Sequence, residues 1–347
     1  SYAGARALTT TSGGGFALMG EGISLAGITE TPLVIHLAQR PGPATGMATR
    51  TEQADLNLAL YAGHGEFPRA IYAPSSVESA FKLTAQAFVT AAKYQTPVIV
   101  LTDQYFLDSA YDVMPPQPET VPFPEKPVTT EDGYQRYAFP APGEVASPRG
   151  VPGRGSGLVG LDSHEHTEDA HISENFELRA RMMDKRLHKL EAMREEALAP
   201  RLFGDPMYQA LIVCWGSLQE SLLEAMRLLD AKGLALVCCE QLYPVSKQLK
   251  LMLKQARRLI FVENNASAQF ARLVHVETGY AATDTVLKYD GQPFSVEELL
   301  ERLKILLNRN ADGNEEKSED RNKNTLVLPG LLVAEKSKED PLEKGGI

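Results

Sequence analysis

The side chains best placed for chemistry lie in one loop, residues 39–56, with the sequence QRPGPATGMATRTEQADL. An apolar, strand-like run at 32–37 precedes it and a helix-like run follows it, so the loop connects a strand to a helix. It presents a guanidinium at Arg40 and hydroxyls at Thr45 and Thr49 among glycines and prolines, which restrict the backbone. Ligands of open α/β sheets bind at the carboxyl ends of strands, so a ligand-binding loop is one interpretation. An ordinary long connecting loop of similar composition is the other.

A second candidate is the glycine-rich turn that follows a β-leaning run at 7–12. Gly13, Gly14 and Gly15 come directly after Ser12 and open a helix-like run. The first turn of a helix has unpaired N–H groups and a partial positive charge, so such a turn can hold an anion. The turn lacks both the G-x-G-x-x-G spacing and the P-loop lysine. Close packing of strand on helix therefore explains the glycines equally well.

Three of the seven histidines, His164, His166 and His171, gather in an acid-rich stretch at 162–171. Such spacing occurs in metal sites, where carboxylates join imidazoles as ligands. Polar loops also collect these residue types, and the stretch precedes a predicted helix start at Ser173. We therefore predict a structural role for these histidines and no metal.

The composition argues against several classes of function. The 347 residues carry a formal net charge of -10 without a local basic cluster, which disfavours nucleic-acid and anionic-membrane partners. No apolar run approaches the roughly 20 residues that a membrane-spanning helix needs. Cys214, Cys238 and Cys239 lie in apolar runs without cluster or zinc spacing. With no disulfide framework and no secretory leader in the sequence, the expected location is the cytoplasm.

Alternating strand and helix patterns predict an α/β protein with two doubly wound parallel-sheet domains. The predicted order is a first domain at 1–113, a Pro/Gly-rich connector at 114–172, a linking charged helix at 173–205, a second domain at 206–310 and a disordered tail at 311–347. The first domain is expected to begin part-way through, at Ser1. The charges of the linking helix are expected on a solvated face, and an apolar patch at 326–333 is a candidate docking segment.

The loop at 39–56 resembles the R-x-G-P-(S/A)-T-G-x-x-T-(R/K)-T-E-Q-x-D-L motif of the α subunit of 2-oxoacid:ferredoxin oxidoreductases, and the 2-oxoglutarate-type members are the most similar. The resemblance extends over most of residues 1–305. Further matching strings are TSGGGF at 11–16, APSSVE at 73–78, KYQTPVIVLTDQY at 93–105, VENN at 262–265 and LKYDG at 287–291. In one departure, Ala48 replaces a proline that many relatives have, which implies a less rigid loop.

This resemblance implies a thiamine-diphosphate enzyme, with a pyrimidine-binding-type first domain and a transketolase C-terminal-like second domain. It implies oxidative decarboxylation of a 2-oxoacid, with 2-oxoglutarate as the first expectation, to acyl-CoA and carbon dioxide. Coenzyme A is then a co-substrate, and the electrons pass to ferredoxin. In such enzymes the cofactor supplies the difficult chemistry, so the chain must bind and orient.

The resemblance also assigns roles to individual residues. Arg40 anchors the substrate carboxylate through paired charged hydrogen bonds, and Thr45 and Thr49 supply neighbouring hydroxyls. Cofactor contacts are assigned to Ser12 and to the two glycines that follow it, Gly13 and Gly14.

Three parts of a complete site are missing from the sequence: a G-D-G magnesium-diphosphate motif, cysteines for a cluster, and the glutamate that activates the cofactor, which in relatives precedes the position of Ser1. In the family, Mg²⁺ and an iron–sulfur cluster belong to a separate β subunit. The chain is therefore expected to be half of a heterodimeric site, inactive alone and without catalytic residues of its own. The alternatives are a non-catalytic assembly subunit, pyruvate or branched-chain specificity, and an unrelated nucleotide-binding protein that uses the glycine turn.

Overall fold

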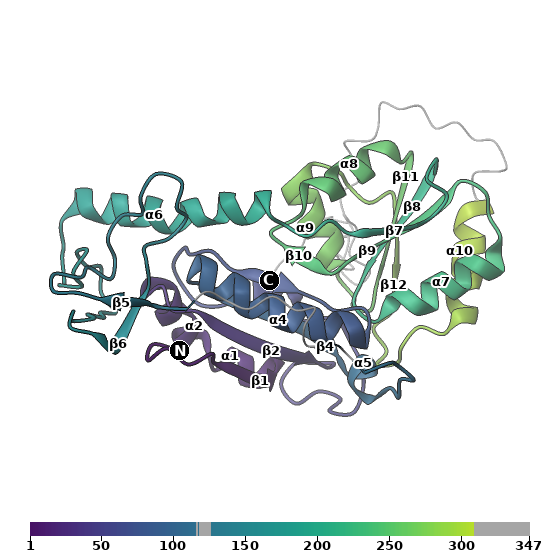
Figure 1. Ribbon diagram of the computed structural model, residues 1–347. Coiled ribbons are helices and arrows are strands. Elements are labelled where there is room, and N and C mark those ends of the chain that lie inside the picture. Colours follow the sequence, from purple (N-terminus) through teal and green to yellow (C-terminus); the bar gives the residue numbers. More distant parts are fainter. Residues whose placement is uncertain (116, 118–125, 309–347) are drawn as a thin grey trace, which may run out of the picture.

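Two α/β domains lie side by side in the computed structural model, and a long helix with its loops extends over the first of them (Figure 1). The structure describes residues 1–115, 117 and 126–308. The predicted tail at 311–347 and its apolar patch at 326–333 lie outside these described residues. In the described part, no helix combines the length and apolar character needed to cross a membrane.

The first domain is built on a five-stranded sheet with the order β1-β2-β4-β3-β10. The strands are β1 (Leu8–Ser12), β2 (Leu33–Gln39), β3 (Ala70–Tyr72), β4 (Pro97–Asp103) and β10 (Gln241–Tyr243). The first four are parallel, whereas β10 runs antiparallel to β3. Every residue of β4 is buried, as expected for a central strand of a parallel sheet with both faces covered.

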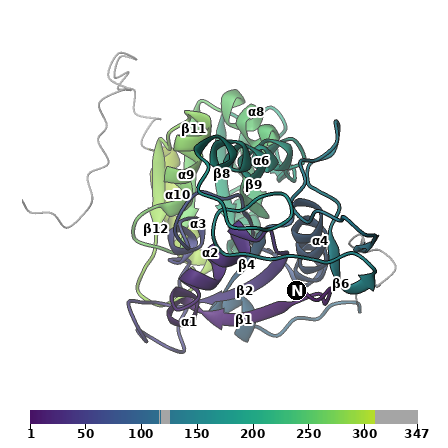
Figure 2. The ribbon, with the colours of Figure 1, turned by 90° about the vertical axis from the view of Figure 1, so that its left-hand side faces the viewer.

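Helices cover both faces of this sheet (Figure 2). They are α1 (Gly13–Ala17), α2 (Gly20–Ile28), α3 (Leu56–Leu60), α4 (Val77–Tyr94) and α5 (Gln104–Asp108). Successive residues of β2 point to opposite faces, so Ile35 packs on the side of α1 to α3 and Val34 on the side of α4. Ser76 is the N-cap of α4 and forms a capping box with Ser79.

The second domain has a sheet with the order β12-β11-β8-β9-β7. Its strands are β7 (Arg201–Gly204), β8 (Ala210–Trp215), β9 (Leu234–Cys239), β11 (Arg258–Glu263) and β12 (Asp284–Leu287). Its helices are α7 (Leu218–Leu229), α8 (Lys247–Gln255), α9 (Gln269–Thr278) and α10 (Val296–Asn308). The three cysteines, which the sequence places in apolar runs, are free and buried in this sheet.

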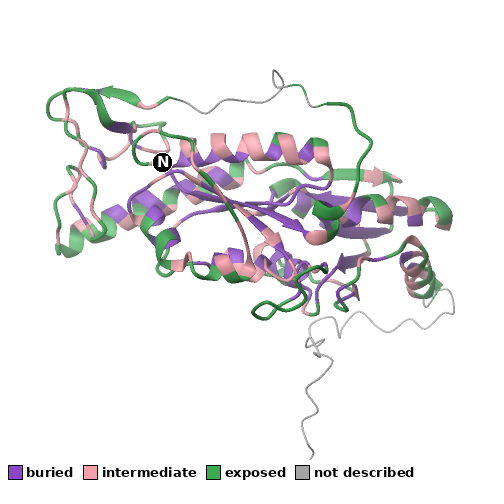
Figure 3. Ribbon diagram, turned by 90° about the horizontal axis from the view of Figure 1, so that it is seen from below, coloured by how far each residue is buried: buried purple, intermediate pink, exposed green. Residues whose placement is uncertain are grey.

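The predicted α/β fold with two parallel sheets is confirmed, with two differences at the sheet edges. Each sheet ends in one antiparallel strand, β7 in the second and β10 in the first. β10 belongs by sequence to the second half of the chain, yet it completes the first sheet. A single apolar cluster also runs from Ile99 in the first sheet to Phe261 in the second, and Figure 3 shows both sheets buried along the molecule.

The connector contributes a small two-stranded sheet, β5 (Val128–Thr130) with β6 (Gly150–Gly155), before the long helix α6 (Phe176–Glu195). Two expectations for this helix are wrong. Its N-cap is Asn175, whose side chain accepts the N–H of Leu178, and not Ser173. Its charges do not all face solvent, because Lys185, Arg186 and Lys189 are buried.

Glu30 explains the buried lysines. Its carboxylate lies in the turn between α2 and β2, where Lys185 donates to Oε1 at 2.8 Å and Lys189 to Oε2. All three side chains are 1% exposed, and we call them the Glu30 clasp. Burial would raise the pKa of Glu30, but the two ammonium groups hold it well below its ordinary range. The clasp fastens α6 to the amino end of β2.

Candidate active site

The predicted site residues converge on the carboxyl edge of the first sheet. β1 and β2 are parallel neighbours, with Ser12 opposite Ala38. Gly13 therefore follows β1 at the same edge where Arg40 follows β2. The sequence predicted these two segments separately, and the sheet brings them together.

The loop after β2 has a defined backbone although its side chains are exposed. The Met47 N–H donates to the Pro41 carbonyl at 3.1 Å, which closes a compact turn. Gly46 has φ +52°, and a Cβ there would lie 1.8 Å from the Pro41 oxygen, so only glycine fits. Thr45 and Thr49 are exposed, and neither hydroxyl makes a hydrogen bond with the residues described. Both hydroxyls can thus bond to a ligand without losing an internal bond.

Arg40 is half-buried at the base of this loop. Within the described part of the chain it makes no hydrogen bond and no close ion pair, and the charged group that it influences is Asp55. A guanidinium that is partly desolvated and not paired within the chain suits an incoming carboxylate, which it can meet with two parallel hydrogen bonds.

Asp55 is a site residue that the sequence reasoning missed. Its N–H donates to Gln39 Oε1 at 3.0 Å, while its buried Oδ2 has no hydrogen-bond partner in the described structure. Burial raises the pKa of Asp55 to about 6, and the charge of Arg40 opposes part of that rise. The pKa of Glu52 is raised as well, by burial and then by the charge of Asp55. The T-E-Q-x-D spacing is visible in the sequence, but it does not indicate that the Asp55 carboxylate lies near Arg40.

The glycine turn is partly explained by packing. A Cβ on Gly13 would lie 2.7 Å from Asp55 Oδ2, and one on Gly15 would lie 2.0 Å from Thr11 Oγ1. Gly14, in contrast, has no atom within 4 Å of an added Cβ. The packing interpretation therefore accounts for Gly13 and Gly15, and Gly14 is the member of the turn that is open to a ligand.

The far end of the loop is held by a buried polar network centred on Gln53. The Gln53 N–H donates to the Asn264 carbonyl at 2.7 Å, and its side chain donates to the Trp215 carbonyl at 3.0 Å. Asp103, at the end of β4, accepts from Ser217 at 2.6 Å, and burial raises the pKa of this carboxyl. These contacts join the two domains directly behind the loop.

The VENN motif at residues 262–265 lies in the same network, just before α9 begins at Gln269. The side chain of Glu263 accepts the N–H groups of Phe270 and Ala271, each at 2.9 Å. The motif therefore caps the helix from the preceding strand.

The three histidines of the 162–171 stretch do not converge. His164 and His171 are exposed and pair with Asp162 and Asp169, respectively. His166 is buried, and the centroid of its ring lies 4.0 Å from that of Tyr137. Across the residues that the structure describes, no group of three or more His, Cys, Asp or Glu side chains could hold a metal ion. The structural role of this stretch stays a prediction.

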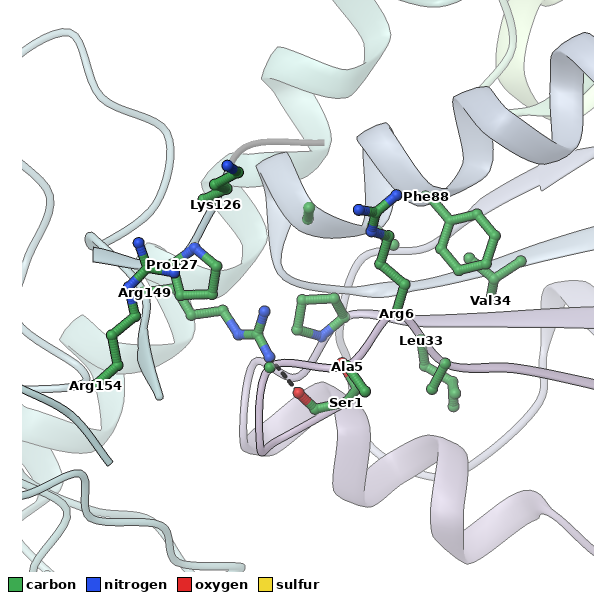
Figure 4. Close-up of a pocket in the computed structure, with 15 residues that line it drawn as sticks. Ser1, Ala5, Arg6, Leu33, Val34, Phe88, Lys126, Pro127, Arg149 and Arg154 are labelled. Carbon is green, nitrogen blue, oxygen red and sulfur yellow. Dashed lines mark hydrogen bonds between the residues drawn. The ribbon is translucent and has the colours of Figure 1, made fainter. Parts of the chain in front are cut away.

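A hollow of about 190 Å³ lies elsewhere, at the amino ends of β1 and β2 (Figure 4). Basic side chains line it: Arg6, Lys126, Arg149 and Arg154. Because the hollow opens at the opposite edge of the sheet from Arg40, it is not the site predicted from the sequence. The predicted site around Arg40 is the open surface of a loop.

Comparison with known proteins relates this geometry to a family. Residues 1–185 match the family described as pyruvate flavodoxin/ferredoxin oxidoreductase, thiamine-diphosphate-binding. The chain belongs to this family. The α subunit of 2-oxoacid:ferredoxin oxidoreductase 1 from Sulfurisphaera tokodaii is 37% identical over 316 residues, which cover 86% of this chain and 48% of that protein.

Two further members of the family are similar. The 2-oxoglutarate synthase subunit KorA of Archaeoglobus fulgidus is 40% identical over 153 residues, 44% of this chain and 43% of that protein. A structure of 2-oxoglutarate:ferredoxin oxidoreductase from Magnetococcus marinus, with 2-oxoglutarate, coenzyme A and succinyl-CoA bound, matches with a TM-score of 0.80 at 29% identity. That match covers 88% of this chain and 54% of the other. The chain spans about half the length of the first curated relatives that it matches.

The thiamine-diphosphate-binding family implies a cofactor, and the residues at the edge of the first sheet fit one wall of its site. Asp55 offers a buried oxygen without a partner, and Gly14 leaves room for close approach to the backbone. Ser12 at the end of β1, with Gly13 and Gly14 after it, would border the cofactor, and Arg40, directly after β2, would lie beside it.

Proposed function

We propose that this chain forms the substrate-binding wall of a 2-oxoacid:ferredoxin oxidoreductase, with 2-oxoglutarate as the preferred substrate. The observation that carries the proposal is Arg40, a half-buried guanidinium without a hydrogen bond in the described chain, at the carboxyl end of β2. The bound thiamine diphosphate supplies the carbanion chemistry of decarboxylation. The chain itself binds and orients the oxoacid.

Each residue of the wall has a distinct part in this proposal. Arg40 pairs with the carboxylate of the oxoacid through a forked hydrogen bond. The exposed hydroxyls of Thr45 and Thr49 then donate to the remaining carboxylate or carbonyl oxygens. A 2-oxoglutarate molecule carries two carboxylates, so a loop with a guanidinium and two hydroxyls is better matched to it than to pyruvate.

The other wall is assigned to a β subunit, which would hold Mg²⁺ and an iron–sulfur cluster and pass electrons to ferredoxin. Coenzyme A would accept the acyl group. Supporting this division, residues 42–50 are exposed in the chain alone, and a site that must exclude water needs a cover over them. The chain by itself should not turn over an oxoacid.

Substitution of Arg40 in the assembled enzyme tests the carboxylate-binding role. Arg40→Ala should lower kcat/KM for the oxoacid by about 30-fold or more, because loss of a buried charge-assisted pair costs about 2 to 4 kcal/mol. Arg40→Lys should recover only part of the activity, since an ammonium group lacks the planar fork. An unchanged kcat/KM in the alanine variant would refute the assignment.

Hydrogen exchange tests the division between two subunits. Residues 9–20 and 38–56 should exchange rapidly in the lone chain and slow down when the β subunit is added. A surface helix away from this edge, residues 247–255, serves as the control and should not change. Equal exchange of the loop in both states, or oxoacid decarboxylation by the lone chain, would contradict the half-site proposal.

The second candidate function is a non-catalytic assembly subunit, in which the same loop only shapes an interface. The exposure of residues 42–50 fits this alternative too. The two functions differ in one measurement, because an interface role predicts that Arg40→Ala weakens association with the β subunit while kcat/KM at saturating β subunit stays unchanged. Comparing pyruvate, branched-chain oxoacids and 2-oxoglutarate on the same enzyme decides the substrate.

A further inference from the structure

A turn of the second domain, residues 288–292, lies directly against the loop that carries Arg40. Gly291 at its tip is buried with φ +83°, and its carbonyl accepts the Thr51 N–H at 3.2 Å. A Cβ on Gly291 would lie 3.1 Å from Met47 Sδ and 3.3 Å from Arg50 Cβ. The glycine therefore allows the second half of the loop to approach more closely than any other residue would.

The turn is itself fixed from within the second domain. Asn264 donates from Nδ2 to the Lys288 carbonyl at 2.8 Å and to the Gln292 carbonyl at 3.4 Å. The Lys288 side chain is buried and donates to Glu298 at 2.6 Å. The turn can therefore act as a rigid support, because its backbone and its buried cation both have partners.

Asn264 also connects this turn to the end of the loop. Its N–H donates to Gln53 Oε1 at 3.1 Å, and its carbonyl accepts the Gln53 N–H. The loop thus begins on β2 of the first domain and ends on contacts with the second domain. Between these two attachments, Met47 is about half exposed and rests on Gly291.

We propose that the 288–292 turn is a positioning element of the substrate site, and that Gly291 sets the distance at which residues 47–50 stand from the bound oxoacid. This inference rests on the proposed function, and it gives the second domain a part in substrate fit in addition to packing. A displacement of about 1 Å in a substrate site can change rates on the order of 100-fold. A side chain on Gly291 that displaces residues 47–50 should therefore change the kinetics with the oxoacid.

The chain provides a matched control for this test. Gly279 has φ +82°, nearly the same as Gly291, but no atom lies within 4 Å of an added Cβ. Gly291→Ala and Gly279→Ala therefore introduce the same backbone strain, and only the first presses on the loop. Both variants should unfold at similarly lowered temperatures.

In the assembled enzyme, Gly291→Ala should raise KM for 2-oxoglutarate by about tenfold over Gly279→Ala, with a smaller change in kcat. Hydrogen exchange at residues 42–50 should be faster in Gly291→Ala only. Met47→Ala should relieve the contact, so the double variant with Gly291→Ala should lose less than the two single variants combined. Equal KM and equal exchange in the two glycine variants would overturn the proposal.

Two results separate this inference from the proposed function. If Gly291→Ala folds poorly, Met47→Ala alone removes the same contact, and unchanged exchange at residues 42–50 in that variant would also overturn the inference. If Arg40→Ala keeps its kcat/KM, the proposed function fails, while the exchange comparison still decides whether the turn holds the loop.

Discussion

The charged groups at the two ends of strand β2 differ in whether they have partners within the chain. At the amino end, the Glu30 clasp buries a carboxylate between two ammonium groups, and every one of these side chains has a partner. At the carboxyl end, Arg40 has no hydrogen bond in the described chain, and Asp55 keeps a buried oxygen without a partner. A buried ion pair is stable only while all of its charged groups are present. Buried polar groups without a partner lower stability, and they are found most often at functional sites, where a bound ligand can supply the partner. The same strand is thus fastened at one end, whereas at the other end its polar groups lack partners in the described chain, as the proposed substrate site requires.

The largest expected effect is at the clasp. Glu30→Gln leaves two buried ammonium groups without a counter-charge, so the free energy of unfolding should fall by about 3 to 5 kcal/mol. Urea denaturation of the chain measures this, with Glu21→Gln as control, because Glu21 pairs with His64 at an exposed position. If the free energy of unfolding of Glu30→Gln fell by less than about 1 kcal/mol, the amino end of β2 would not be the more stabilising end of the strand.

The clasp also predicts a dependence on pH. Because the pKa of Glu30 is lowered in the folded chain from an ordinary value of 4.5, its contribution is complete above that pH and is lost as the pH falls further. The difference in unfolding free energy between the wild-type chain and Glu30→Gln should therefore shrink on acidification. A difference that stays constant between pH 7 and about pH 3 would contradict this assignment.

Arg40→Ala should give the reverse pattern of effects. Its free energy of unfolding should stay within about 0.5 kcal/mol of the wild-type value, because no internal hydrogen bond is lost, although kcat/KM falls strongly. Parallel denaturation and kinetics on one preparation measure both quantities. A large loss of stability in this variant would show that the carboxyl end of β2 is also built for the fold.

The smallest expected effect is at Asp55, and its sign differs from that at Glu30. The pKa of this carboxyl is raised from 3.8 to about 6, so the folded chain loses stability as the pH rises from about 4 to about 6, where the carboxyl is ionised in the unfolded chain but still protonated in the folded one. Asp55→Asn should therefore be more stable than the wild type at pH 8, by about 1 kcal/mol, and the gain should vanish below about pH 4. Thermal unfolding at both pH values tests the sign. A variant less stable than the wild type at pH 8 would contradict it.

The sequence could predict the Arg40 loop at the carboxyl end of β2 but not the Glu30 clasp at its amino end. The Arg40 loop is local, because its strand, its turn residues and its candidate ligands all lie within residues 32–56, and the structure has them at the expected sheet edge. The Glu30 clasp joins residues 155 and 159 positions apart, so no spacing pattern connects them. For the same reason the charges of α6 were misassigned to a solvated face.

Long-range contacts also account for the site residues that were missed. Gln53 and Asp103 look unremarkable in their own segments, yet both become buried when the second domain packs against them. Asp55 became visible as a site residue only once the fold placed it beside Gly13. Strand and helix alternation gave the sheets correctly, but it could not reveal that β10 crosses to the first sheet, since three residues carry too little pattern.

Strand β10 makes the first sheet dependent on a late part of the chain. Gln241 pairs with Tyr72, so β3 remains an open edge until residues 241–243 have emerged from the ribosome. At about 5 to 20 residues per second, that interval lasts on the order of ten seconds or more. During synthesis the edge of β3 therefore stays without its partner strand, and a chain ending before residue 241 lacks this strand of the first sheet.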